Sequence, residues 1–131
     1  MKQLLQPPGW PRPRGYANGV VSSGRQIFVA GQIDWDAQGH FASNRRADPV
    51  RPALANVLAV LHESGASPQH VMAMTWNATS KAEYLAQGAE IGAALRELVG
   101  VYSIAMSAVQ VSALMEDQAR VEIEDTAALP D

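Results

Sequence analysis

The spacing of apolar residues changes along the chain, and the order of the changes restricts the fold. Residues 26–33 form a β-prone run, whereas the apolar side chains of residues 54–61 recur at intervals of three and four. The first pattern is typical of a strand and the second of an amphipathic helix. Asp48 supplies an N-cap, Pro49 takes the first helical position, and Gly65 closes the segment. The sequence therefore predicts one helix between these flanking residues.

A short connection with a glycine, residues 23–25, joins the β-prone residues 20–22 to the strand at 26–33. This arrangement is typical of a β-hairpin. After a turn, Phe41 is expected to begin a short edge strand before the polar loop of residues 43–47.

A capping box of Ser80 and Glu83 predicts the start of a second helix, which is expected to run to about Val99. Gly88 and Gly92 lie inside this helix. Each glycine costs up to about 1 kcal/mol relative to alanine in a helix. Their presence suggests that the helix packs closely against a neighbouring backbone.

Three further segments read as strands, at residues 71–77, 105–112 and 119–126. In the first, both alternating sets of side chains are largely apolar, which predicts a central strand covered on both faces. In the last, Val121 and Ile123 alternate with charged residues, which predicts one buried and one polar face.

The order hairpin, helix, strand, helix, strand, strand predicts an α/β (α+β) sandwich, with a mixed six-stranded sheet and two helices on one face. A chain of 131 residues fits a single domain, 1–131, in which residues 1–14 form an extended proline-rich arm. Two helices cover only one face of such a sheet. Self-association is therefore the economical way to cover the other face.

Composition excludes several chemistries. The chain has no cysteine, so thiolate metal sites and a cysteine nucleophile are ruled out, and its three histidines share no metal-ligand spacing. We therefore expect no metal. A formal net charge of -3 disfavours nucleic acid as a partner. Because the sequence shows neither a secretory signal pattern nor an apolar run of membrane-spanning length, we expect a cytoplasmic protein without a membrane partner.

Four strings of the sequence carry a resemblance to the RidA/YjgF family, also described as endoribonuclease L-PSP. They are Gly-Tyr-Ala-Asn-Gly at 15–19, Ile-Phe-Val-Ala-Gly-Gln-Ile at 27–33, Ala-Leu-Ala-Asn-Val-Leu-Ala-Val-Leu at 53–61, and Val-Glu-Ile-Glu at 121–124. The resemblance implies a chorismate-mutase-like fold and a homotrimer in which the sheets form a central barrel. It also implies a small-molecule cleft at each subunit interface. Deaminating members hydrolyse 2-imino acids and their enamine tautomers without a cofactor.

The resemblance assigns roles to individual residues. Tyr16 matches a tyrosine near the cleft, Gly31 a glycine whose backbone lies against the ligand, and Glu122 the glutamate that orients the attacking water. The sequence departs from the family where a Pro-Ala-Arg string is expected. Its arginine, which pairs with the substrate carboxylate, is Met106 here, and a cysteine two residues further on is Ala108.

The replacement of arginine by Met106 changes the expected ligand. A guanidinium offers paired donors and a full charge to a carboxylate, whereas a thioether offers mainly apolar contact. Losing such a charge-assisted pair removes on the order of 1.5 to 3 kcal/mol of binding. A simple 2-imino acid is therefore not the expected substrate, although Arg14, Arg25 or Arg96 could compensate from elsewhere in the sequence.

Each candidate residue also has a purely structural interpretation. Glu122 could be a solvated charge on the polar face of a strand, Tyr16 a packing anchor, and Met106 a core residue. Two functions consequently stay open. One is a cofactor-independent hydrolase acting on an imine, enamine or related carbon–nitrogen bond, and the other is a noncatalytic trimer that binds a small ligand. The acidic balance argues against ribonuclease activity.

Overall fold

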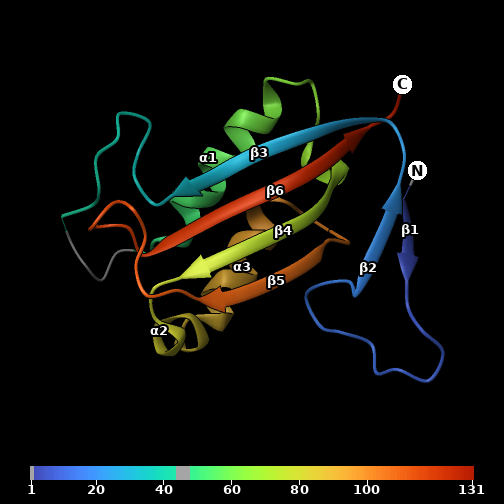
Figure 1. Cartoon of the computed structure of the whole chain (residues 1–131), viewed down its shortest axis with the longest axis horizontal. Coiled ribbons are helices and arrows are strands. Elements are labelled where there is room, and N and C mark those ends of the chain that lie inside the picture. The colour runs from blue at the N-terminus through green and yellow to red at the C-terminus, as the bar shows by residue number, and fades with distance from the viewer. Residues whose placement is uncertain (1, 44–47) are drawn as a thin grey trace.

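The computed structural model describes residues 2–43 and 48–131 (Figure 1). Most of the polar loop expected at 43–47 thus lies outside the described residues. The elements are β1 (Lys2–Leu5), β2 (Gly19–Ser22), β3 (Arg25–Ile33), α1 (Val50–His62), a 3₁₀ turn (Pro68–His70), β4 (Val71–Ala78), α2 (Lys81–Ala86), α3 (Gly88–Leu98), β5 (Ala105–Gln110) and β6 (Val121–Leu129).

A mixed four-stranded sheet forms the centre of the structure, with the order β3-β6-β4-β5. β4 and β5 are parallel, whereas β6 runs antiparallel to both of its neighbours. The helices α1 and α3 lie on one face of this sheet (Figure 1). The predicted α+β architecture is confirmed, as is the central position of the strand at 71–77, because β4 lies between β6 and β5.

The predicted hairpin is wrong, although strands do flank residues 23–25. β2 pairs with β1 in a separate two-stranded sheet, and β3 pairs with β6, so six strands form two sheets instead of one. A type I′ hairpin turn needs positive φ at two successive residues. Here Gly24 has a φ of 122° and Ser23 does not have a positive φ. The first residues of the expected arm, Lys2–Leu5, are the strand β1.

The close packing around Gly24 explains why this position requires glycine. A Cβ on Gly24 would lie 2.4 Å from the backbone oxygen of Leu129, the last residue of β6. Real Cβ atoms do not approach an oxygen so closely, and the left-handed φ also favours glycine. Gly24 therefore lets the chain leave β2 and enter the four-stranded sheet beside the end of β6.

The first predicted helix is confirmed as α1, although Pro49, expected at the first helical position, is its N-cap. The Asp48 carboxylate, one residue earlier, accepts a hydrogen bond from the amide of Val50 at 2.8 Å. The second predicted helix divides into α2 and α3 at Gln87, whose φ and ψ of -98° and 16° interrupt the helical path. Its predicted start holds, since the Ser80 hydroxyl accepts from the amide of Glu83 at 3.1 Å. Phe41 forms no strand, and its ring instead lies 5.8 Å from that of Trp35.

Among the described residues, one carboxyl group, that of Asp125, lies in the core between helices and sheet. Asp125 on β6 pairs in register with Val29 on β3 and with Met74 on β4, and all three are buried. Asp125 is 4% exposed, and neither of its carboxylate oxygens has a hydrogen-bond partner among the described residues. Burial raises the pKa of Asp125 to about 7. Asp125 therefore places an acid on the apolar face that the alternation of Val121 and Ile123 predicts for this strand.

Candidate functional site

A cavity of ≈ 460 Å³ lies where α2 and α3 meet the edge strand β5. A volume of this size falls within the range of ordinary small-molecule sites. We call it the β5 cavity. Its lining comes from four parts of the chain: Arg14, Gly15 and Tyr16; Trp76; Tyr84, Gly88, Ile91, Gly92 and Leu95; and Tyr102, Met106, Ser107 and Ala108.

Three of the five predicted site residues, Tyr16, Met106 and Ala108, line the β5 cavity together. The backbone places Tyr16 beside β5, because the amide of Ala17 donates to the carbonyl oxygen of Ile104 at 2.8 Å. Tyr16 itself is 44% exposed, so it borders the cavity and is not a buried packing anchor. The residue that replaces the expected arginine thus does face a ligand-sized space.

The two glycines of α3, Gly88 and Gly92, line the β5 cavity and do not pack against a neighbouring backbone. A Cβ on Gly88 would meet nothing within 4 Å, and one on Gly92 would meet only the side chain of Arg96. The expectation that both glycines pack against a neighbouring backbone is therefore wrong. Because both residues line the β5 cavity, their missing side chains leave room in it.

Four aromatic side chains, those of Tyr16, Trp76, Tyr84 and Tyr102, line the cavity. The rings of Trp76 and Tyr84 meet edge to face with centroids 6.4 Å apart. Burial, followed by the nearby Tyr102, raises the pKa of the Tyr84 hydroxyl, so this group remains a hydrogen-bond donor at neutral pH. Trp76 is 1% exposed, and its indole nitrogen has no acceptor among the described residues.

The other two predicted site residues, Gly31 and Glu122, touch each other on neighbouring strands. A Cβ on Gly31 would lie 2.5 Å from Cδ and 2.7 Å from Oε1 of Glu122. Since no side chain fits between them, the Glu122 carboxyl group lies directly against the backbone of β3. Gly31 therefore determines where this carboxylate can sit.

The two groups of residues lie on opposite faces of the sheet. Met106 pairs in register with the buried Met74, and Ala108 with Trp76, so both belong to the face that the helices cover. On β6 the buried Ile123 points to this same face, and by strand alternation Glu122 points to the other. A single chain therefore does not bring all five residues to one place.

The face that carries Glu122 is open. Phe28 on this side of the sheet is 73% exposed, an unusual position for a large apolar side chain in a strand. A depression of ≈ 420 Å³ surrounds it. Its lining residues are Phe28, Val29, Ala30, Ala73, Thr75, Glu124, Asp125 and Thr126.

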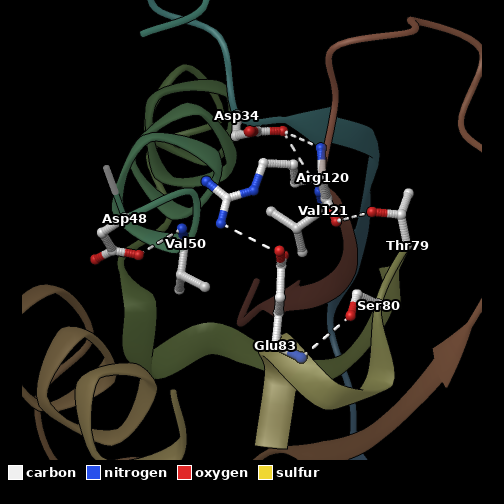
Figure 2. Close-up of polar contacts among 8 residues, drawn as sticks. All are labelled: Asp34, Asp48, Val50, Thr79, Ser80, Glu83, Arg120 and Val121. Atoms are coloured by element: carbon white, nitrogen blue, oxygen red, sulfur yellow. Dashed lines mark hydrogen bonds and ion pairs between the residues drawn. The ribbon is translucent and has the colours of Figure 1, made fainter. Parts of the chain in front are cut away.

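A polar cluster that the sequence did not reveal holds the start of β6 (Figure 2). Asp34 accepts hydrogen bonds from the amides of Arg120 at 2.9 Å and Val121 at 3.4 Å. The Arg120 guanidinium lies 3.4 Å from the Glu83 carboxylate, and the Thr79 hydroxyl donates to the Arg120 carbonyl at 3.3 Å. These contacts position the strand that carries the predicted catalytic glutamate. A cavity of ≈ 450 Å³ beside the cluster is lined by none of the five predicted site residues.

Within residues 2–43 and 48–131, no three histidine, aspartate or glutamate side chains gather closely enough to hold a metal ion. No helix in the same ranges has the length and apolarity needed to cross a bilayer.

The fold and the β5 cavity define a small α+β protein with a ligand-sized space at the edge of its sheet. The endoribonuclease L-PSP family model matches residues 11–129, so the chain belongs to this family. The resemblance found in the sequence is thereby confirmed.

Individual relatives agree with this assignment. YyfB of the Rid protein family from Yersinia pestis is 30% identical, with 98% of each chain covered and a TM-score of 0.82. The RutC family protein PH0854 of Pyrococcus horikoshii is 29% identical over 125 residues, which is 95% of each chain. TdcF of E. coli, solved with bound serine, is 28% identical, with 97% of this chain and 98% of that chain covered and a TM-score of 0.66.

Proposed function

We propose that the protein hydrolyses a carbon–nitrogen bond in a small imine, enamine or related ligand, with a water molecule oriented by Glu122. The observation that carries the proposal is the close approach of Gly31 and Glu122, which leaves the carboxylate against the backbone of β3. The sequence resemblance matches Glu122 to the glutamate that orients water in deaminating members of the family. Water adds to the imine carbon while the carboxylate accepts a proton from it. That proton passes to the nitrogen and gives a carbinolamine. Its hydroxyl proton is then transferred to the nitrogen by way of the carboxylate as the carbon–nitrogen bond breaks, so a carbonyl compound and ammonia leave.

The proposed assembly is a homotrimer in which the open sheet faces pack together. Two observations support it: the exposed Phe28 on that face, and the placement of Glu122 and Met106 on opposite faces of one chain. In such an assembly Glu122 of one copy lies near the β5 cavity of the next copy. Each site would then consist of residues from two chains.

Met106 limits the substrate of the proposed reaction. The thioether offers no charge to a carboxylate next to the reacting bond, so a compact 2-imino acid is held weakly. The serine bound to TdcF supports a small, polar ligand for the shared fold. We therefore expect a substrate imine whose charge lies further from the reacting carbon.

A noncatalytic trimer that binds a small ligand is the second candidate. The observation that favours it is the same Met106, because a protein that no longer grips the family's substrate carboxylate need not perform the family's reaction. Both candidates bind their ligand in the β5 cavity. They differ in the role of Glu122, which takes part in a reaction in the first candidate and only lies near a bound ligand in the second.

Ammonia release from freshly generated 2-iminopropanoate and 4-iminopentanoate tests the proposal. The Glu122→Gln variant is expected to lower kcat for 4-iminopentanoate by about 100-fold or more, since it removes the proton acceptor. Glu124→Gln, on the same strand and exposed, is the matched control and should change little. Met106→Arg is expected to raise kcat/KM for 2-iminopropanoate by about tenfold, the effect of one charge-assisted pair.

Two results would count against parts of this proposal. Rapid turnover of 2-iminopropanoate by the wild type would contradict the substrate limit drawn from Met106. Failure of the wild type to release ammonia from either imine, with ligand binding unchanged in Glu122→Gln, would favour the noncatalytic trimer.

A further inference from the structure

The pairing of β3 with β6 is irregular beside Glu122. Between two register pairs, residues 30 and 31 of β3 lie opposite the single residue Glu124 of β6. An extra residue in one strand is a β-bulge, and bulges re-aim side chains next to functional sites. Gly31 belongs to this bulge, and the Glu122 side chain lies directly against it. The carboxyl group of Glu122 therefore leans from β6 toward β3.

On its other side, Glu122 has Asn77 of β4 as its neighbour. The two residues are partners in the antiparallel register of β4 and β6. Side chains directly opposite each other in such a pair share one face of the sheet, with Cβ atoms about 4.5 to 5.5 Å apart. Trp76 and Ala78 on either side of Asn77 are buried, so alternation along β4 also places Asn77 on the open face. Asn77 and Glu122 are therefore adjacent polar residues on that face.

The direction in which Glu122 leans leaves space between its carboxyl group and Asn77. β3 and β4 are the two neighbours of β6, so they are two strand spacings apart, about 9 to 10 Å. The carboxyl group lies over β3, whereas Asn77 projects from β4. A single water that bonds to two groups joins atoms roughly 5 to 6 Å apart, because each of its hydrogen bonds is about 2.8 Å long. The space over β6 thus matches a water-sized molecule better than a direct hydrogen bond.

The two side chains have complementary hydrogen-bonding chemistry. An ionised carboxylate only accepts hydrogen bonds, whereas a carboxamide also donates through its Nδ2–H groups. Both Glu122 and Asn77 are half-buried, whereas Glu124, on the same face of β6, is exposed. A molecule between Glu122 and Asn77 is therefore more sheltered from solvent than one beside Glu124.

We propose that Asn77 binds, together with Glu122, the water molecule that attacks the imine carbon. An Nδ2–H of Asn77 donates to the water oxygen, and the water donates one of its protons to the Glu122 carboxylate. The second lone pair of the oxygen then forms the bond to carbon, and the donated proton passes to Glu122. The inference rests on the proposed function, because it assigns a second water-binding residue to the same reaction.

Steady-state release of ammonia from 4-iminopentanoate by full-length Asn77→Ala and Asn77→Asp tests the proposal. Each change should lower kcat by about tenfold, the effect of one hydrogen bond, since ionised aspartate keeps the shape of asparagine but cannot donate. The KM should stay within about twofold, because the water and not the substrate loses a partner. Thr75→Val changes the next residue of β4 on the same face, opposite Glu124, and is the matched control with unchanged kcat.

A double variant separates water binding from a structural role of Asn77. In the Glu122→Gln background, Asn77→Ala should cause little further loss, since both residues act on one water. Full additivity of the two losses would overturn the inference, as would an unchanged kcat in Asn77→Asp or a raised KM at constant kcat. In each of these cases a low kcat in Glu122→Gln alone would still support the proposed reaction. No ammonia release by the wild type would overturn both.

The Tm and the sedimentation of each variant serve as the control for folding. Both should match those of the wild type, because Asn77 is only half-buried. If Asn77→Ala does not fold, Asn77→Asp decides, since it preserves the volume of the side chain.

Discussion

Replacing Asp125 by asparagine is expected to raise the Tm of the protein by roughly 10 °C at pH 8, since each kcal/mol moves the Tm of a domain of this size by a few degrees. The side chain is buried between Val29 and Met74, and its carboxylate oxygens have no partner among the described residues. An unpaired buried carboxylate is strongly disfavoured in its charged form. Asparagine has nearly the same shape and stays neutral at every pH.

The direction of the pH effect follows from the raised pKa. The pKa of Asp125 is raised from its usual value of 3.8 to about 7 in the folded protein. The folded protein therefore binds the carboxyl proton of Asp125 more tightly than the unfolded chain does. The tighter binding of this proton stabilises the folded protein fully below about pH 4. This stabilisation decreases as the pH rises and is lost above about pH 7. A shift of this size corresponds to about 4 kcal/mol.

Thermal unfolding at pH 5 and pH 8, at one protomer concentration, measures the effect. The wild type should lose stability between these values, and Asp125→Asn should lose much less. Glu124→Gln removes an exposed carboxylate from the next position of β6 and is the control. A wild-type Tm that stays constant or increases from pH 5 to pH 8 would show that Asp125 is not the buried, protonated group described here.

Replacing Gly31 by alanine is expected to lower kcat by about 100-fold, an effect comparable to that expected for Glu122→Gln. The added Cβ would lie 2.5 Å from Cδ of Glu122, so the carboxylate must move. Because the obstacle is the flexible end of a side chain, the fold itself should tolerate the change, and the Tm should shift by only a few degrees.

Two comparisons separate displacement of Glu122 from general damage. Gly19→Ala, in the two-stranded sheet, brings a Cβ to 3.0 Å from the Leu5 side chain and should leave turnover unchanged. In the Glu122→Gln background, Gly31→Ala should cause no further loss, since both changes act on one carboxylate. Additive losses would mean that Gly31 acts independently of Glu122.

The positions of most elements follow from local sequence patterns. The apolar spacing before Gly65 and the capping box at Ser80 involve neighbouring residues, so they predict α1 and the start of α2 correctly. Strand pairing depends on contacts between distant segments. The glycine at 24 is compatible with a hairpin, and only its contact with Leu129 shows that the chain leaves one sheet for another.

The candidate site was predictable only in part for the same reason. The alternation of Val121, Glu122 and Ile123 already places the glutamate on the polar face of its strand. Nothing local indicates that Met106 belongs to the opposite face, because that depends on its pairing with β4. The position of Arg14 at the β5 cavity could not be predicted either, because a proline-rich segment has no periodicity that indicates which residues it contacts.

The central claim is that the site has two halves, the β5 cavity on one sheet face and Glu122 on the other, which meet only between copies. Subunit mixing tests it most directly. Ala108→Trp fills the cavity, Glu122→Gln removes the carboxylate, and each variant alone should be inactive toward 4-iminopentanoate. In trimers formed from equal amounts of both, about a quarter of the sites combine an open cavity with an intact glutamate. We therefore predict that the mixture recovers about a quarter of wild-type turnover. A mixture no more active than the separate variants would contradict the claim.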